Sequence, residues 1–294
     1  MKIRLGTRGS RLALVQSELF AQRLRDAGHE VEMVRIVTEG DVRPVDMSPG
    51  EGVFVAAIAR ALIAGEIDIA VHSAKDVPLD EDPELVIAAH PERADPRDVL
   101  VTRDGHQSLD TLRSGATVGT DSPRRAGFLL AARPDLHVVP LHGNVDSRLQ
   151  RLDRGEVDAV VLAAAGIDRL GAGERIDQRL DPEVLAPAPA QGALAVQARR
   201  SDIDLVRLLG SYDAQHVRLA VQTEREVLRA TGGTCRAPVG ALAAIDGDSF
   251  TLLVAGVNSD GTGKRVEHVG GSCKDALELA TAAGRRLVAE VALR

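Results

Sequence analysis

Short apolar runs alternate with stretches of helical periodicity along the N-terminal and central parts of the chain. Six runs have the length and the Val, Ile and Leu content of strands, and they cover 30–37, 66–73, 85–90, 116–120, 137–141 and 156–163. Residues 53–65 and 122–134 instead carry apolar side chains at helical spacing. Strands that alternate with helices predict an α/β fold with parallel-type layers.

Two pairs of segments in this region resemble each other. Residues 5–14 (LGTRGSRLAL) match 118–127 (VGTDSPRRAG), because in both a strand ends in Gly-Thr and a serine opens a helix that carries arginine. Residues 65–71 (GEIDIAV) match 155–161 (GEVDAVV). Since the two segments occur in the same order each time, we expect two similar α/β lobes.

The pattern changes near residue 181. Residues 181–197 are rich in Pro, Ala and Gly, which predicts a hinge or a return crossing. A long helix around 214–230, an antiparallel meander over 239–271 and a closing helix near 274–290 predict a small α+β domain with a three-stranded antiparallel sheet. We therefore expect lobe 1 at 1–96 with 193–211, lobe 2 at 97–192 and a C-terminal domain at 212–294.

Composition fits several globular cores and disfavours some partners. The chain has 294 residues, of which 44% are apolar. Only 2% are aromatic and the net charge is −7, which disfavours nucleic acid as a partner. No apolar run approaches the roughly 18 residues of a membrane span, and the N-terminus lacks the apolar stretch of a signal peptide. We expect a cytoplasmic protein with no membrane partner.

Basic and hydroxyl side chains recur where predicted strands give way to helices. In an α/β lobe these turns gather at the carboxyl ends of the strands, where ligands bind, and arginine forks match carboxylate oxygens in pairs. The candidates are Arg8, Ser10, Ser73, Lys75, Asp76, Ser122, Arg124, Arg125, His142, Arg148 and Arg169. Together they predict a cleft for a ligand with several carboxylates or phosphates. Taken singly, each arginine also fits a solvated helix face, and Ser122 before Pro123 fits a simple helix cap.

The segment HSAKDVP (72–78) combines a cation and a carboxylate after an apolar strand. In an extended chain Lys75 and Asp76 would point to opposite sides. Asp76 could then stabilise a developing cation or move a proton, and Lys75 could pair with a ligand carboxylate. A Schiff-base lysine and a plain surface ion pair are the alternatives at this point.

Two cysteines occur, with no CxxC pattern, so neither a disulfide framework nor a zinc site is expected. Cys235 lies in GGTCRAPVG, where a glycine-rich approach and the adjacent Arg236 favour a reactive or modified thiolate. A small buried apolar residue is the alternative for Cys235. Cys273 begins the last predicted helix, and we interpret it as structural.

Nine motifs taken together resemble the porphobilinogen deaminases, also called hydroxymethylbilane synthases, in the same order and over nearly the whole chain. They are GTRGSRLAL, GDV, HSAKDVP, DPRD, VGTDSPRR, GNVDSRL, AAAGIDRLG, PAPAQGALAVQ and ER…GGTCRAPVG. The resemblance implies two lobes like those of bilobal binding proteins, a small C-terminal domain and a monomer. It also implies a transferase that joins four porphobilinogen units head to tail, loses ammonia each time and releases 1-hydroxymethylbilane by hydrolysis.

The resemblance further assigns roles to the candidate residues. Cys235 matches the cysteine that carries a dipyrromethane primer through a thioether, and Asp76 matches the catalytic aspartate. The primer's carboxylates are assigned to Ser73, Lys75, Ser122, Arg124 and Arg125, with Asp76 also beside the primer. The substrate and the growing chain are assigned to Arg8, Ser10, His142, Arg148 and Arg169.

Some positions depart from the family pattern or remain open. His142 stands where the family usually has arginine, which makes this cation weaker and dependent on pH. Glu51 stands where lysine is common, and Thr234 where a second glycine commonly precedes the cysteine. Phe54 matches an apolar residue near the ring site, although a core position fits it equally. Two rival functions are a non-catalytic bilobal carboxylate-binding protein and a Schiff-base enzyme that uses Lys75.

Overall fold

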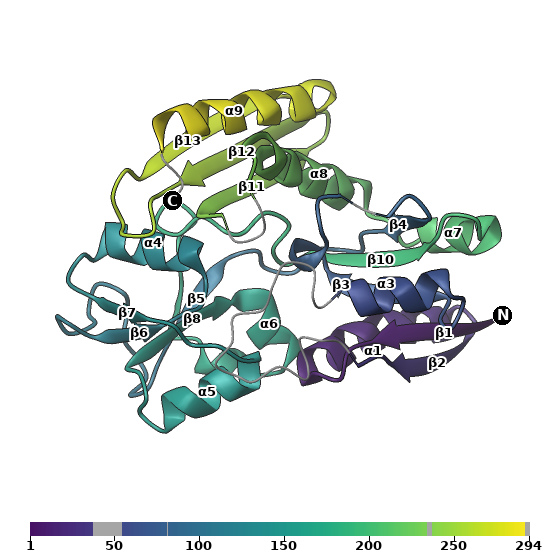
Figure 1. Ribbon diagram of the computed structural model, residues 1–294, viewed down its shortest axis with the longest axis horizontal. Helices are drawn as coiled ribbons and strands as arrows, with labels where there is room; N and C mark the ends of the chain where they lie inside the picture. Colours follow the sequence, from purple (N-terminus) through teal and green to yellow (C-terminus); the bar gives the residue numbers. More distant parts are fainter. Residues whose placement is uncertain (38–54, 81, 234–236, 292–294) are drawn as a thin grey trace. The chain divides into compact units, whose positions relative to one another are not determined.

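The computed structural model describes residues 1–37, 55–80, 82–233 and 237–291, and it divides into two compact units (Figure 1). Unit 1 comprises Met1–Arg93 and Ala193–Arg218, and unit 2 comprises Ala94–Gly192 and Leu219–Arg294. Among the helices of the described residues, none has the length and apolar character needed to cross a membrane.

Unit 1 contains a five-stranded mixed sheet in the order β2-β1-β3-β10-β4. β1 pairs in parallel with β2 and β3, whereas β10 runs antiparallel to both β3 and β4. Helices α1 and α7 cover one face of the sheet, and α3 covers the other. The bounds are β1 Lys2–Thr7, α1 Arg11–Asp26, β2 Glu30–Arg35, α3 Ala56–Ile63, β3 Ile69–Ser73, β4 Leu85–Ala89, β10 Leu194–Arg199 and α7 Ile203–Gly210.

Strand β3 is buried on both faces, as the apolar run at its start predicts. Ile69 and Val71 pack into the core that contains Phe20 of α1, whereas Ala70 between them packs into the core that contains Leu62 of α3. Successive side chains of a strand point to opposite faces, so one five-residue strand serves two cores. Ala74, the residue that follows β3, therefore continues from a strand that is packed on both faces.

Unit 2 repeats this design with the sheet order β7-β6-β8-β5-β9. β6 pairs in parallel with β7 and β8, and β5 runs antiparallel to β8 and β9, which matches unit 1 strand for strand. The expected pair of similar α/β lobes is confirmed. The bounds are β5 Asp98–Thr102, β6 Thr117–Gly119, α4 Pro123–Ala132, β7 His137–Val139, α5 Val145–Asp153, β8 Ala159–Ala163, α6 Ala164–Arg169 and β9 Gln178–Arg179.

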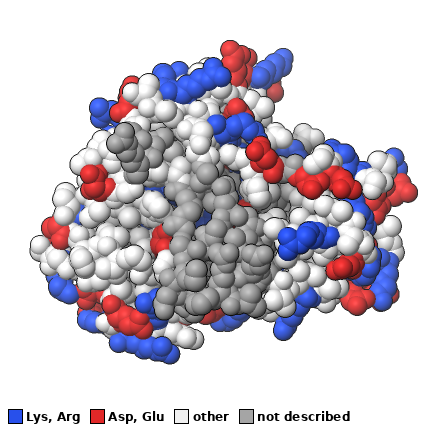
Figure 2. All heavy atoms as spheres, in the orientation of Figure 1, with Lys and Arg blue, Asp and Glu red and all other residues white. Residues whose placement is uncertain are grey.

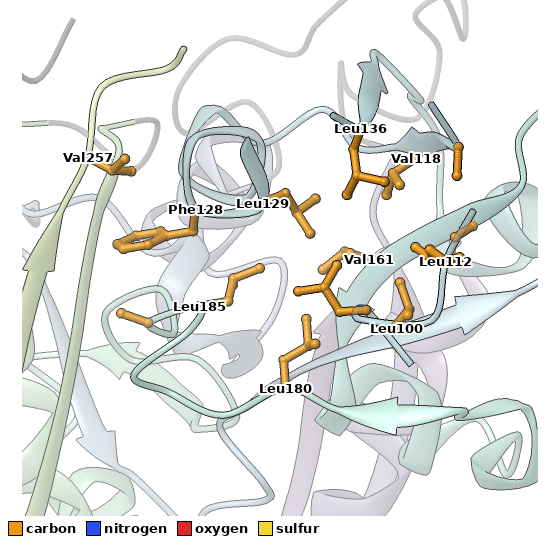
Figure 3. Close-up of a cluster of buried hydrophobic side chains, with 14 of the residues drawn as sticks. Leu100, Leu112, Val118, Phe128, Leu129, Leu136, Val161, Leu180, Leu185 and Val257 are labelled. Atoms are coloured by element: carbon orange, nitrogen blue, oxygen red, sulfur yellow. The ribbon is translucent and has the colours of Figure 1, made fainter. Parts of the chain in front are cut away.

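Two cores flank the sheet of unit 2. On one face Leu100 and Val161 pack with Phe128 of α4, and Val257 from the C-terminal part of the chain lies in the same cluster (Figure 3). On the other face the strands pack against α5 and α6. The helix that begins after Ser122 is therefore fixed by apolar contacts one turn beyond its N-terminus.

The predicted C-terminal elements are present. Helix α8 (Gln215–Ala230) precedes the antiparallel strands β11 (Val239–Asp246), β12 (Ser249–Gly256) and β13 (Arg265–Ser272), and helix α9 (Ala276–Glu290) packs on their sheet. Gly247 and Gly261 take φ values of 56° and 87° in the two connecting turns, a backbone region that glycine enters without strain. The α/β fold class with a three-stranded antiparallel sheet is confirmed.

The segment 181–197, expected as a hinge or crossing, differs in part from that prediction. Its end forms β10, which lies inside the sheet of unit 1 between β3 and β4. Earlier in the segment, the buried Glu224 of α8 accepts hydrogen bonds from the amides of Ala190 (2.6 Å) and Ala243 (2.8 Å). This carboxylate ties the segment to β11, so the backbone there is anchored by specific bonds. The three-domain division remains a prediction.

Charged side chains of both signs are interspersed on the molecular face drawn in Figure 2. Several form ion pairs, such as Lys2 with Glu32 (3.1 Å) and Arg175 with Asp153 (2.6 Å). Exposed pairs of this kind contribute little stability. These exposed pairs therefore do not by themselves mark a binding site.

Candidate active site

The predicted site residues with described coordinates fall into two groups, one in each unit, and each group lies at the carboxyl ends of parallel strands. In unit 1 the loop after β1 carries Arg8 and Ser10, and the end of β3 carries Ser73. Ser10 is the N-cap of α1, because its side chain accepts a hydrogen bond from the amide of Ala13 (3.4 Å). Ser10 therefore has a structural role in addition to the predicted contact with substrate.

A pocket of about 40 Å³ lies between these loops. Its apolar wall is formed by Val55, Ile58 and Val71, whereas Arg8 and Asp76 belong to its polar lining. Arg8 is half-buried and Asp76 is exposed. The pocket is small, and it combines an apolar wall with a cation and an anion.

Gln16 and His72 also line the pocket, and sequence reasoning missed both. The Gln16 side-chain amide donates to Oγ of Ser73 (3.1 Å), which places helix α1 directly against the end of β3. Nε2 of His72 lies 3.2 Å from Oε1 of Gln197 on β10. Burial lowers the pKa of His72 to about 4, against the opposing effect of the Gln197 hydrogen bond, so this imidazole is neutral near pH 7. These two residues supply uncharged polar contacts beside the charged ones.

Lys75 and Asp76 do not lie in extended chain, as the sequence analysis assumed. They belong to a 3-10 turn, Ala74–Asp76, that follows β3 immediately. Ala74 is buried and its amide donates to the carbonyl of Ala193 (3.0 Å), which fixes the turn to the strand beside it. Lys75 is half-buried and Asp76 is exposed, so the carboxylate is the more accessible of the two charges.

In unit 2 the loop after β6 leads into α4 through Ser122. The Ser122 hydroxyl caps the helix by accepting from the amide of Arg125 (3.4 Å), with Pro123 in the first turn. The helix-cap interpretation is therefore confirmed, while binding of a primer carboxylate by Ser122 stays a prediction.

Arg124 and Arg125 are buried and both bind Asp98, a residue that sequence reasoning missed. Oδ2 of Asp98 accepts from Arg124 (2.7 Å), and Oδ1 accepts from Nε (3.0 Å) and Nη2 (2.7 Å) of Arg125. Oδ1 also accepts from the side-chain amide, Nε2, of Gln191 (3.0 Å). Burial lowers the pKa of Arg124, and the Asp98 charge opposes that shift.

The predicted role of Arg124 and Arg125 is to bind the primer's carboxylates directly, and the geometry of this cluster bears on that role. Both guanidinium groups are already engaged by one carboxylate and by the backbone carbonyls of Ala186 and Val161. Two positive charges face one negative charge, which leaves a net positive charge beneath the loop after β6. An anionic ligand there would be attracted by the field of the cluster rather than by an unoccupied arginine fork.

His142 and Arg148 lie at the end of β7 and on α5, respectively. Nδ1 of His142 is 2.9 Å from Oδ1 of Asp121, and both side chains are mostly buried. Burial lowers the pKa of Arg148 to about 10, a change that Asp121 opposes and Arg125 reinforces. Arg148 therefore stays charged near pH 7 while much of its hydration is lost.

Arg169 ends α6 and is half-buried. Its Nη2 donates to the carbonyl of Gly192 (2.7 Å), and burial lowers its pKa to about 10. Like Arg148, it is a partly desolvated cation near a strand end, and such a cation favours an anionic ligand.

Of the two cysteines, Cys273 lies among the described residues and Cys235 does not. Cys235, together with Phe54, Glu51 and Thr234, lies outside the described residues. Cys273 begins the short turn Cys273–Asp275, is half-exposed, and has its sulfur 3.8 Å from the carbonyl of Gly247. This placement agrees with the structural interpretation of Cys273.

Two family models match the chain. The model described as "Porphobilinogen deaminase, dipyromethane cofactor binding domain" matches residues 3–207, and "Porphobilinogen deaminase, C-terminal domain" matches residues 218–290. Each model carries the name of the enzyme, and the first also names the cofactor that its domain binds.

Full-length relatives and solved structures give further matches. Porphobilinogen deaminase of Roseiflexus sp. strain RS-1 is 46% identical over 97% of this chain and 98% of its own length. Porphobilinogen deaminase of Acidothermus cellulolyticus is 47% identical over 98% of this chain and 88% of its own length. The solved structure of the methionine-binding protein MetQ matches 76% of this chain and 94% of that chain with 17% identity and a TM-score of 0.47.

The sequence relatives and both family models agree over nearly the whole chain, including the segments that carry Asp76 and the arginine pair. The enzyme acts in tetrapyrrole synthesis with porphobilinogen as substrate and dipyrromethane as cofactor. The chain belongs to the porphobilinogen deaminase family.

Proposed function

We propose that this transferase deaminates porphobilinogen and joins four units head to tail on a dipyrromethane primer attached to Cys235. Hydrolysis then releases 1-hydroxymethylbilane and leaves the primer in place. The observation that carries the proposal is the pocket of unit 1, where an exposed aspartate and a half-buried arginine flank an apolar wall. We also propose that the enzyme works as a monomer in the cytoplasm.

The residues of the chain suit a primer of two pyrrole rings with acidic side chains. In unit 1, Ser73 ends one strand, and Lys75 and Asp76 follow it; in unit 2, Ser122 caps the helix that carries Arg124 and Arg125, which pair with Asp98. Lysine and serine donors would bind the carboxylates, and the cluster would attract them over a longer range. When bound, the primer supplies the nucleophilic ring carbon to which the first substrate is joined.

Asp76 would act at the step in which ammonia leaves. The bond between the methylene carbon and nitrogen of porphobilinogen breaks, the electron pair leaves with the nitrogen, and positive charge develops on the substrate's pyrrole. A carboxylate beside that ring stabilises the charge. The new carbon–carbon bond then forms, and Asp76 would accept the one proton that the joined rings lose. Ammonia is the only other product of each addition.

The basic residues would hold the substituents that do not react. Arg8 faces the same pocket as Asp76, and Arg148 and Arg169 are partly desolvated cations in unit 2. Arginine pairs with a carboxylate through two parallel hydrogen bonds, which fixes orientation as well as position. Within unit 1, the contact with Arg8 would keep the reacting carbon within reach of Asp76.

The attachment point is tested by comparing the two cysteines. The intact mass of the purified protein should exceed the sequence mass by one dipyrromethane, and Cys235→Ser should remove this increment together with activity. Cys273→Ser is the matched control, and it should keep both because its sulfur lies 3.8 Å from the Gly247 carbonyl in a turn of the C-terminal sheet. Retention of the added mass in Cys235→Ser, or its loss in Cys273→Ser, would contradict the assignment.

A further inference from the structure

The loops after β6 and β7 run side by side in unit 2, because the two strands are parallel and the amide of Thr120 donates to the carbonyl of Val139 (2.9 Å). Asp121 follows one strand and His142 follows the other. Their facing atoms, Oδ1 and Nδ1, are 2.9 Å apart, and their side chains are 17% and 18% exposed. A carboxylate and an imidazole are thus held together at the strand ends where substrate is expected to bind.

The two side chains are close but not aligned for a hydrogen bond. Although the atoms are 2.9 Å apart, Nδ1 of His142 has no aligned hydrogen-bond partner among the described residues. An unaligned pair gains little from hydrogen bonding, so a proton on the imidazole would add mainly an attraction between opposite charges. An imidazole is also the side chain whose ordinary pKa lies nearest to neutral pH.

Arg148 is a neighbouring cation on which Asp121 acts. Its Nε is buried and finds no hydrogen-bond acceptor among the residues described here. The charges that act on Arg148 are Asp121 on the β6–α4 loop, Arg125 on α4 and Arg151 on α5, and α5 also carries Asp146 in its first turn. Asp121 is the only acidic group among those three interacting charges, so whatever neutralises Asp121 leaves Arg148 more attractive to an anion.

We propose that protonation of His142 tunes the affinity of this site for a substrate carboxylate. With His142 neutral, Asp121 offsets the charge of Arg148. With His142 protonated, the imidazolium offsets Asp121, and the three groups together carry one net positive charge. The inference rests on the proposed function for the identity of the ligand, a pyrrole carboxylate, but its electrostatic part depends only on these three side chains.

Two substitutions of His142 each imitate one charge state of the imidazole: His142→Arg the protonated state and His142→Gln the neutral state. We expect the KM of the holoenzyme for porphobilinogen to rise about three- to tenfold between pH 6 and pH 8.5, with a smaller change in kcat. His142→Arg should give a KM that stays at the low-pH value of the wild type, and His142→Gln one that stays at the high-pH value. His137→Gln is the control, because His137 is exposed on β7 and should leave the wild-type profile unchanged.

A second measurement works without turnover. The Arg148 Nε–H resonance of 15N-labelled holoenzyme, titrated with succinate as a simple dicarboxylate, should move at lower succinate concentration at pH 6 than at pH 8.5. His142→Gln should abolish this dependence on pH. Retention of the pH dependence in His142→Gln, by either measurement, would overturn the proposal, as would a wild-type response that does not change with pH. The protein could also bind succinate with a pH dependence that His142→Gln removes, yet show no activity toward porphobilinogen. That result would support the proposal for His142 while contradicting the proposed function.

Discussion

Asp76→Ala should abolish ammonia release while it leaves the fold intact. The carboxylate is exposed on a pocket that also contains Arg8, and its 3-10 turn is fixed by the buried Ala74 rather than by Asp76 itself. A positioned acid–base group contributes about 10²- to 10⁴-fold to a rate. We therefore expect kcat to fall by about that factor, with KM changed far less.

The measurement is ammonia release by protein that mass spectrometry shows to carry the primer. Asp80→Ala is the matched control, since Asp80 is an exposed aspartate shortly after the same turn and should retain normal turnover. The free energy of unfolding of both variants should lie within about 0.5 kcal/mol of the wild-type value, because each substitution removes a surface side chain. A kcat for Asp76→Ala within threefold of the wild type would remove Asp76 from the mechanism.

Asp98→Asn should cause the largest loss of stability among single changes in unit 2. The carboxylate is fully buried and accepts from Arg124, Arg125 and Gln191. Asparagine keeps the shape but leaves two buried guanidinium groups without a counter-charge. Removal of one partner from a buried ion pair costs about 3 to 5 kcal/mol, so we expect a loss of that size in the free energy of unfolding.

Urea unfolding of the two variants Asp98→Asn and Asp104→Asn provides the comparison. Asp104 is exposed and pairs with Arg103 at 3.2 Å, so its loss should change the free energy of unfolding by less than about 1 kcal/mol. If Asp98→Asn loses no more stability than Asp104→Asn, the buried cluster does not stabilise unit 2. If Asp98→Asn does not fold, Asp98→Glu should recover a folded protein because it restores the charge.

The layered fold could be predicted because its strongest signals are local. β8 is a continuous apolar run, β3 begins with one, and the Gly-Thr turns at the ends of β1 and β6 mark the repeated unit. β10 was not predicted as a strand, although 193–211 was assigned to lobe 1, because its apolar run follows a segment dense in Pro and Ala. Its place in the sheet depends on pairing with β3 and β4, which are distant in sequence. Local periodicity carries no information on such pairing.

The same distinction holds for the site. Arg8, Ser73 and Asp76 were selected from strand-to-helix turns, and all three line one pocket because the topology of an α/β lobe brings such turns together. The engagement of Arg124 and Arg125 with Asp98 could not be predicted, since burial and partner choice are decided by tertiary packing. Residues such as Gln16 were missed for the same reason, as a glutamine within a helix has no signal apart from its spatial neighbours.

The central claim is that substrate units accumulate on the protein through the primer. Intact-mass spectrometry of the holoenzyme mixed with a few equivalents of porphobilinogen tests it directly. A series of up to four added masses, each equal to one porphobilinogen less one ammonia and all located on the peptide that contains Cys235, is the predicted result. Product formation without any such series, or an adduct that borohydride traps on Lys75, would contradict the account.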